Sequence, residues 1–287
     1  MKDERFNKVF IGSGLIAEIF LHALIRHKGE SPDDFYILGK NEERCEQLRK
    51  KYQIRATTNF NAFVSKAKVI VLAVDVSDLN DIPEMVDLIR DKVPPNALIN
   101  SVTPKLSIEQ IEKYFPNHPV MRLMINFSAI NGNNLGSYLC GSVAPEDTEP
   151  VAKFLIDCLG DFIEVNSEEE FEKIFDVIFA QNCSNYLAMN CFINAAIKIG
   201  LTPHQARKIA ANTYKGVGET FSEKYTDDTL RRMFEFKEVF DKGLEMMDEL
   251  GLAEALKSIH NPPPKTPART FRSDDADNYK FRYRGWD

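Results

Sequence analysis

The sequence predicts an α/β protein: a doubly wound, mostly parallel sheet in the N-terminal half, followed by an all-α second half. Short apolar runs at residues 8–11, 35–38 and 69–74 alternate with stretches of helical periodicity. The run at 69–74 is apolar throughout, as expected of a strand covered on both faces. A last strand is predicted at residues 162–165, after which helical patterns take over. Strands that alternate with helices favour parallel pairing through right-handed crossovers.

Local signals mark the ends of these elements. After the first strand, apolar residues recur at helical spacing from residue 16 to residue 24. Asn41 is a candidate helix N-cap after the second strand. Ser107 and Gln110 have the spacing of a capping box, in which two side chains satisfy the first amides of a helix. Two further strands are predicted, at residues 97–100 and 120–124.

The C-terminal half carries helix signals of its own. Ser167 with Glu170, and Thr202 with Gln205, are capping-box patterns that open long helical stretches. From Glu168 roughly thirty residues pass without Pro or Gly, which is longer than the usual helix of a globular protein. A helix of that length indicates a central bundle element or a dimer interface.

Composition excludes several classes of function. The 287 residues carry 36 Lys and Arg against 43 Asp and Glu, so the net charge of -7 offers no cationic field for nucleic acid or anionic lipid. No apolar stretch approaches the roughly 20 residues of a membrane span. We therefore expect a cytoplasmic protein without nucleic-acid or membrane partners. The five cysteines form no CxxC pair and the histidines no HExxH pattern, so neither a metal site nor a disulfide scaffold is expected.

A glycine-rich turn follows the first predicted strand and opens the first helix. It matches G-x-G-x-x-[GA] through Gly12, Ser13, Gly14, Leu15, Ile16 and Ala17. In that context Gly12 permits the tight turn, Gly14 lets backbone amides approach a pyrophosphate, and Ala17 permits close helix packing. The helix dipole favours the anion. The turn predicts a Rossmann-type dinucleotide site; the alternative is a plain glycine turn.

The end of the second predicted strand indicates which dinucleotide binds. An NAD-selective site usually has a carboxylate there for the ribose hydroxyls. This sequence has Lys40 and Asn41 instead, with Arg44 one turn into the helix. The two cations could face a 2′-phosphate, with Asn41 as a donor, so NADP(H) is favoured. The alternative is that both cations are solvated surface charges.

Several segments resemble pyrroline-5-carboxylate reductases, in the order that family shows. Residues 11–18 look like its IGxGxMAE turn, and residues 71–74 look like its VxLAVKP strand. Residues 120–126 are similar to VVRxMPN, and residues 200–213 resemble GLxxxxAxxLAxQT. The resemblance runs from about residue 8 to residue 256.

The resemblance implies reduction of a cyclic imine by hydride from a nicotinamide, in a homodimer. It implies that Asn126 lies near the nicotinamide, that Ala73 and Val74 lie along the cofactor, and that Ser184 and Thr213 face the substrate carboxylate. The expected domains are an NADP-binding domain at residues 1–166, a helical substrate and dimerisation domain at 167–259, and a Pro-rich, charged tail at 260–287.

The sequence departs from the family where substrate would bind. The family's AVKP, MPNTPA and GSGPAY segments correspond to residues 73–76, 124–129 and 183–188, and its PGGTT has no clear counterpart near residues 225–230. Asp227 and Asp228 in that region would repel a carboxylate. We therefore expect a cyclic imino acid substrate with an altered pocket. The alternative is an inactive NADPH-binding sensor or scaffold.

Other interpretations stay open at individual residues. Asn126 could cap local backbone, and the Thr213 hydroxyl could bond its own helix. A β-hydroxyacid dehydrogenase would need a catalytic lysine early in the long helix, where Lys173 precedes the expected pocket. A prephenate-type dehydrogenase would need a histidine, and none occurs between His118 and His204.

Overall fold

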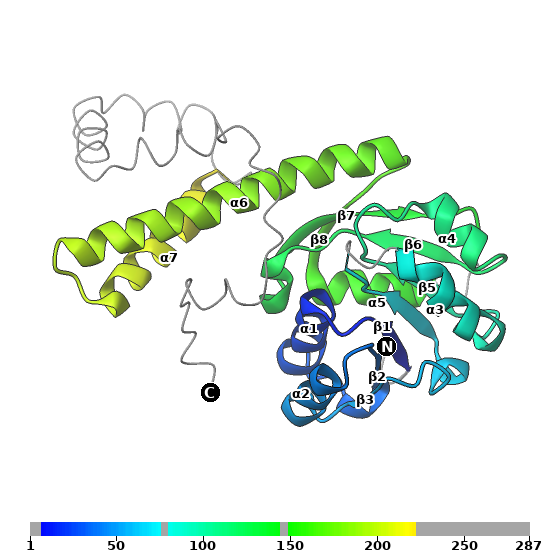
Figure 1. The fold of residues 1–287 in the computed structure, drawn as a ribbon. Coiled ribbons are helices and arrows are strands. Elements are labelled where there is room, and N and C mark those ends of the chain that lie inside the picture. Colours follow the sequence, from blue (N-terminus) through cyan, green and yellow to red (C-terminus); the bar gives the residue numbers. More distant parts are fainter. Residues whose placement is uncertain (1–6, 76–79, 144–148, 222–287) are drawn as a thin grey trace. The chain divides into compact units, whose positions relative to one another are not determined.

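The computed structural model describes residues 7–75, 80–143 and 149–221. The chain divides after Asn182 into two compact units. The first unit contains an eight-stranded sheet with helices on both faces (Figure 1). The predicted fold class, a doubly wound sheet followed by helices, is confirmed.

The strand order places the N-terminal strand in the middle of the sheet. The order is β3-β2-β1-β4-β5-β6-β7-β8. All neighbours pair in parallel except β6 and β7, which are antiparallel. The strands are β1 Lys8–Ile11, β2 Phe35–Leu38, β3 Arg55–Thr57, β4 Val69–Leu72, β5 Leu98–Ser101, β6 Val120–Leu123, β7 Asn134–Cys140 and β8 Gly160–Glu164. The chain moves outward to β2 and β3 and then returns to β4 on the other side of β1. The crevice between the ends of β1 and β4 is where ligands of such sheets bind.

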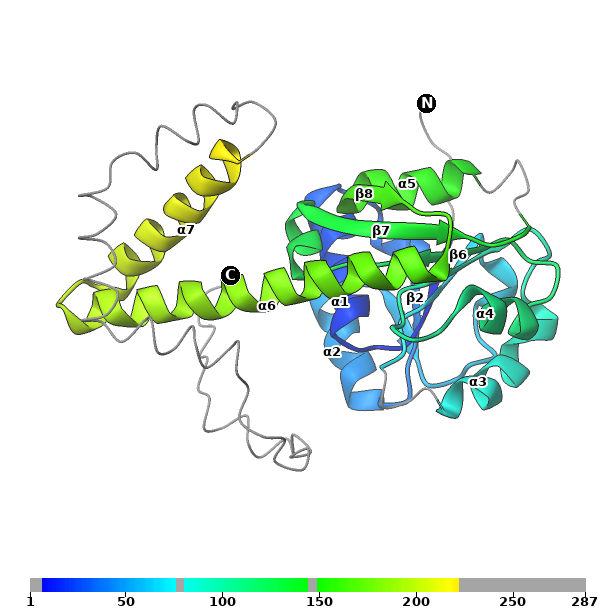
Figure 2. The ribbon, with the colours of Figure 1, turned by 90° about the horizontal axis from the view of Figure 1, so that it is seen from above.

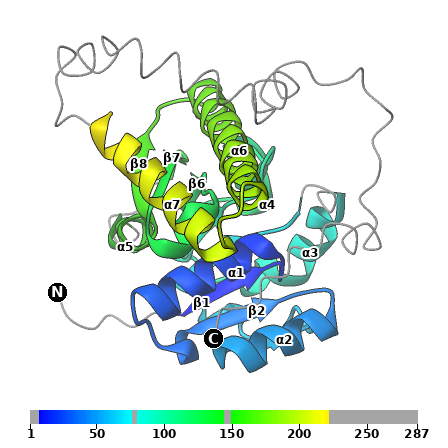
Figure 3. The same ribbon diagram turned by 90° about the vertical axis from the view of Figure 1, so that its left-hand side faces the viewer.

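Helices cover both faces of the sheet. The helices are α1 Leu15–Leu21, α2 Glu42–Tyr52, α3 Ile82–Ile89, α4 Ile108–Tyr114, α5 Glu149–Leu159, α6 Glu168–Lys198 and α7 Pro203–Thr220. Residues of α1, α2 and α5 share one buried cluster, and residues of α3 and α4 share the other. Figure 2 shows α5 on one side of the strands with α3 and α4 on the other, and Figure 3 shows α1 and α2 beside β1 and β2.

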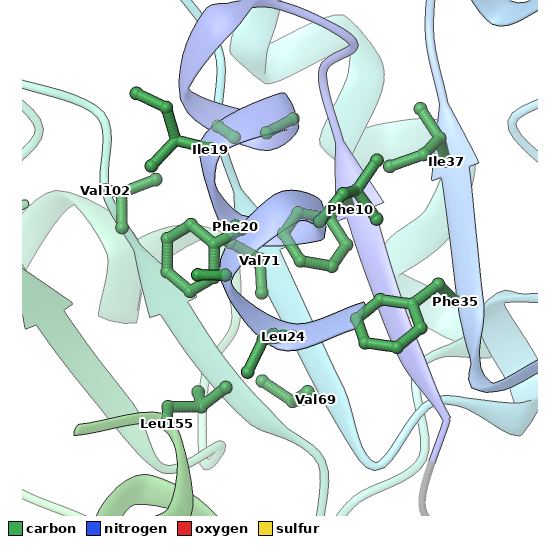
Figure 4. Packing of buried hydrophobic residues seen from close by; sticks show 14 of the residues in the cluster. Phe10, Ile19, Phe20, Leu24, Phe35, Ile37, Val69, Val71, Val102 and Leu155 are labelled. Carbon is green, nitrogen blue, oxygen red and sulfur yellow. The ribbon is translucent and has the colours of Figure 1, made fainter. Parts of the chain in front are cut away.

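Aromatic packing fixes α1 against the central strand. The rings of Phe10 on β1 and Phe20 on α1 meet edge to face at 5.6 Å, and the ring of Phe35 on β2 stacks on Phe10 at 6.3 Å (Figure 4). Leu24 and Leu155 close the same cluster from α1's continuation and from α5. Burial of three such rings supplies several kcal/mol and sets the position of the turn before α1.

The predicted helix caps at Asn41, Ser107 and Thr202 are confirmed, whereas the capping box predicted at Ser167 is half formed. The Asn41 side chain accepts the Arg44 amide at 2.9 Å, and both halves of the capping box are present at Ser107 and at Thr202. At the start of α6, Ser167 accepts from the amide of Glu170, while the Glu170 carboxylate accepts from the amide of Asn166 instead.

Two strands were not predicted from the sequence. β3 has three residues, Arg55–Thr57, and β7 contains both glycine and serine, so neither has a strand's apolar pattern. The apolar run at 69–74 forms a strand only as far as Leu72, because Ala73 and Val74 already belong to the loop. The tail at 260–287 and the region at 225–230 lie outside the described residues.

The long predicted helix is present as α6, and it crosses the boundary between the two units. Its first turns pack on the sheet unit, where Phe171 is buried with Met124, Leu139 and Val165. In the second unit Ala195, Ala206 and Ala210 are buried. The boundary between the two compact units thus lies within α6, after Asn182.

Exposed apolar side chains are common on both long helices. They are Val177, Phe179, Tyr186, Leu187, Phe192, Ile197, Ile209 and Val217. Among the described residues, no helix combines the length and the apolar character that crossing a membrane requires.

A buried arginine ties α6 to the sheet. The Arg122 side chain on β6 is 4% exposed and forms ion pairs with Glu168 and Glu172, the latter at 3.0 Å. Its guanidinium also lies 4.2 Å from the centre of the Phe171 ring. The second oxygen of Glu168 accepts the Ile108 amide at 2.6 Å. One cation thus joins β6, α4 and α6.

We expect Arg122→Ala to lower the free energy of unfolding by about 3 kcal/mol, because two carboxylates lose their partner at a buried position. Both carboxylates are partly exposed and can regain water, which keeps the loss near the lower end for a buried pair. Urea denaturation measures it. The matched control is Lys173→Ala, which breaks an exposed pair with Glu169 and should cost about 0.5 kcal/mol or less. Equal losses in the two variants would contradict the prediction.

Candidate functional site

The candidate site begins at the turn between β1 and α1. Gly12 has φ +113°, a conformation that side-chain-bearing residues rarely adopt. A Cβ atom there would overlap the Ala73 carbonyl group, whose carbon would lie at 2.7 Å. The Gly12 amide donates to the Leu38 carbonyl at 2.8 Å. The fold therefore requires glycine at this position.

Gly14 differs, because nothing in the fold requires it. Its φ is -74°, and a Cβ atom placed on it would meet nothing within 4 Å. It is the N-cap of α1, where no side chain accepts a hydrogen bond from the first-turn amides. Exposed amides at a helix start beside open space suit a phosphate group. The residues of the turn thus fit a dinucleotide.

The other turn residues have distinct surroundings. Ser13 and Ile16 are half-buried, Leu15 is exposed, and Ala17 is fully buried against the core, as the motif predicts. Ser13 packs against Gly39 at the end of β2, where a Cβ atom would lie 2.6 Å from the Ser13 hydroxyl oxygen.

Gly39 was missed by sequence analysis, although a glycine directly after the second strand was a usable signal. A Cβ atom at residue 39 would also lie 3.0 Å from the Cys45 sulfur. Burial raises the pKa of the Cys45 thiol, so this cysteine stays protonated and serves packing. The end of β2 can approach the turn only because residue 39 lacks a side chain.

The three residues expected near a 2′-phosphate follow Gly39. Lys40 is exposed and forms an ion pair with Asp81, which precedes α3. The Asn41 oxygen caps α2. The Arg44 guanidinium pairs with the Glu18 carboxylate and donates to the Ser13 carbonyl at 3.0 Å. Lys40 and Arg44 thus flank the turn, and both have protein partners.

Ala73 and Val74 follow β4, and Ala73 lies against Gly12 of the turn. The Ala73 amide donates to the Ile11 carbonyl at 2.8 Å. The Val74 amide donates at 3.1 Å to the hydroxyl of Thr103, which is 2% exposed. The same hydroxyl lies 3.1 Å from the carbonyl oxygens of Leu72 and Val74. Thr103 was missed because its partners lie about thirty residues earlier in the chain.

Asn126 lies after β6 and is held by three local hydrogen bonds. Its side-chain oxygen accepts the Ser128 amide at 2.8 Å and its side-chain nitrogen donates to the Leu135 carbonyl at 3.1 Å. Its backbone amide donates at 2.8 Å to Asn134, a buried residue. Local capping, the alternative considered from sequence, is present. The side-chain amide of Asn126 has two donor hydrogens and two acceptor lone pairs. Its bonds to Ser128 and Leu135 use one lone pair and one hydrogen, so one of each is left.

Ser184 and Thr213 belong to the second compact unit. Ser184 is half-buried on α6, and Thr213 is exposed on α7. Val76, Asp227 and Asp228 lie outside the described residues. Within the described ranges, no group of three or more His, Cys, Asp or Glu side chains could hold a metal ion.

The glycine turn, the strand order and the helical continuation define an α/β protein of the dinucleotide-binding type. Residues 8–100 match a family model described as NADP oxidoreductase, coenzyme F420-dependent. Along most of its length the chain is similar to pyrroline-5-carboxylate reductases.

Three comparisons illustrate that relationship. The chain is 26% identical over 220 residues to pyrroline-5-carboxylate reductase of Synechocystis, covering 74% of this chain and 78% of that protein. The structure of the Coxiella burnetii enzyme aligns with TM-score 0.68 at 22% identity, covering 90% of this chain and 97% of that one. The Plasmodium falciparum enzyme with NADP bound aligns with TM-score 0.68 at 14% identity, covering 90% and 98%.

The two turn glycines should respond differently to the same substitution. Gly12→Ala should lower the free energy of unfolding by about 3 kcal/mol, because it combines a strained φ with a backbone clash. Gly14→Ala should leave stability within about 1 kcal/mol of the parent, since its φ suits alanine. Thermal unfolding of the two variants compares them, and a large loss in Gly14→Ala would be the contrary result.

Proposed function

We propose that this protein is an NADP(H)-dependent oxidoreductase that reduces the C=N bond of a cyclic imino acid. The observation that carries the proposal is the Gly14 position, which the fold leaves open beside uncapped amides of α1. Similarity to pyrroline-5-carboxylate reductases over most of the chain supports the reaction class. The NADP bound in the Plasmodium falciparum enzyme supports the cofactor.

The proposed cofactor would be held by backbone more than by side chains. The amides that follow Gly14 would receive the pyrophosphate, and the close packing at Gly12 keeps that turn in place. Ala73 and Val74, braced by Thr103, would bound the crevice. Lys40 and Asn41 would face the 2′-phosphate. When bound, the nicotinamide supplies the hydride.

The chemistry asks little of the protein beyond positioning. A protonated imine is already electrophilic, so carboxylate binding and exclusion of water can supply most of the catalysis. We assign carboxylate binding to Ser184 and Thr213 and a place beside the nicotinamide to Asn126. The departures from the family at residues 183–188 and 225–230 alter the carboxylate side, so we propose that pyrroline-5-carboxylate is a modest substrate.

We expect NADPH to bind at least about tenfold more tightly than NADH, a difference of about 1.4 kcal/mol. Lys40→Ala should remove most of this preference, because that ammonium group is the exposed cation beyond Gly39. Titration by quenching of protein fluorescence gives both dissociation constants. Gly14→Ala serves as a second variant, since it should weaken both nucleotides while the fold stays intact. Equal affinities of the parent protein for NADPH and NADH would refute the preference.

A panel of cyclic imino acids, followed by NADPH depletion, tests the reaction. We expect turnover on at least one imine, with pyrroline-5-carboxylate roughly a hundredfold below the best substrate, since loss of donors around a carboxylate costs a few kcal/mol. Thr213→Ala should lower turnover and leave NADPH affinity unchanged, whereas Asn126→Ala should alter both. Tight NADPH binding with no turnover on any imine would favour the inactive sensor.

We also propose that the protein is a homodimer built on its helical part. The apolar side chains exposed along α6 and α7, among them Phe179, Tyr186 and Ile209, would be covered by the second copy. Light scattering at micromolar concentration should give twice the 32.7 kDa of one chain. A mass equal to one chain would exclude the dimer.

A further inference from the structure

The guanidinium group of Arg44 is turned toward the glycine turn. Its Nε donates to the Ser13 carbonyl oxygen at 3.0 Å, and its Nη2 pairs with the Glu18 carboxylate. Its Nη1 donates to the Gln47 side chain at 3.3 Å. The edge formed by Nε and Nη2, which can bind an oxyanion through two parallel bonds, is therefore engaged by protein groups.

Glu18 is the residue that holds Arg44 in this orientation. The Glu18 side chain is 16% exposed. One of its oxygens pairs with Arg44, and the other lies 2.9 Å from the Lys51 ammonium and 3.3 Å from the Tyr52 hydroxyl. Burial alone would raise the pKa of Glu18, but the hydrogen bonds from Lys51 and Arg44 outweigh it and leave the pKa below its ordinary value. The carboxylate therefore stays charged and joins α1 to α2.

The bond from Arg44 sets the direction of the peptide group between Ser13 and Gly14. A trans peptide is planar, with its carbonyl and its amide hydrogen on opposite sides. With the Ser13 oxygen directed at Arg44, the Gly14 amide hydrogen points away from the guanidinium. Ser13 is confined on its side-chain face as well, by its contact with Gly39. The turn thus receives its orientation from α2.

We propose that Glu18 and Arg44 are a positioning pair that fixes the glycine turn for the pyrophosphate, and that Arg44 does not discriminate NADPH from NADH. Lys40 and Asn41 then carry the discrimination. The donor edge of Arg44 is engaged by Ser13 and Glu18 at a partly buried position, whereas Lys40 pairs with Asp81 at an exposed position where solvent screens the pair. The proposal rests on the proposed dinucleotide function.

The test measures the dissociation constants of NADPH and NADH for the parent protein, Glu18→Gln and Arg44→Lys. Gln lacks the charge that holds Arg44, and Lys cannot donate to Ser13 and Glu18 from one planar group. Each variant should weaken both nucleotides by the same factor, between about threefold and tenfold, with the ratio of the two constants unchanged within about twofold. Lys40→Ala, measured in parallel, should change the ratio.

Lys51→Gln is the matched control for a merely structural role. It removes another partner of Glu18 and loosens the same α1–α2 contact, but it leaves the bond from Arg44 to Ser13 in place. Both nucleotide affinities should stay at parental values in this variant. Adenosine 2′-monophosphate, which has the 2′-phosphate and no pyrophosphate, should bind Arg44→Lys as well as it binds the parent protein.

Three results would overturn the proposal while the parent protein still binds both nucleotides. They are loss of NADPH affinity alone in Arg44→Lys, unchanged affinities in both Glu18→Gln and Arg44→Lys, and an equal loss in Lys51→Gln. If either Glu18→Gln or Arg44→Lys prevents folding, the affinities of the other variant test the proposal by the same criteria. A parent protein that binds neither nucleotide would instead refute the proposed function itself.

Discussion

The close approach of Gly12 to the Ala73 carbonyl is the constraint on which the site depends. It brings the turn before α1 against the residues that follow β4. A side chain at residue 12 would separate these two elements. The aromatic cluster around Phe10 stabilises the approach of Gly12 to Ala73, since it packs α1 against β1. Backbone geometry thus shapes the glycine turn.

Paired charges organise the regions around the sheet. Lys8 on the central strand is fully buried and pairs with Glu30 at 3.0 Å, and Arg122 pairs with two glutamates of α6. Near the turn, Glu18 forms ion pairs with Arg44 and Lys51 of α2. A buried charge is costly without such partners. The ion pairs of Arg122 join β6 to α6, and those of Glu18 join α1 to α2.

The similarity of the chain to the pyrroline-5-carboxylate reductases is uneven along its length. The turn matches the glycine motif of those proteins at Gly12, Gly14 and Ala17, of which the fold requires Gly12 and buries Ala17. The segments at residues 124–129 and 183–188 keep Asn126 and Ser184 but exchange most of their neighbours. A phosphate site depends on backbone geometry and resists change, whereas a substrate site depends on side chains and can change without loss of the fold.

The sequence by itself determined the fold class, the glycine turn, and the caps at Asn41, Ser107 and Thr202, because each depends on residues a few positions apart. It did not predict β7, whose pairing compensates for a weak strand pattern. Only the tertiary structure decided the orientation of Arg44, since its partners Ser13 and Glu18 lie 31 and 26 residues away. The hydrogen bonds of the Thr103 hydroxyl to Leu72 and Val74 also depend on the tertiary structure. A long side chain can reach several partners that are distant in the sequence. Which of them it contacts is decided only when the sheet has brought α1 and α2 together.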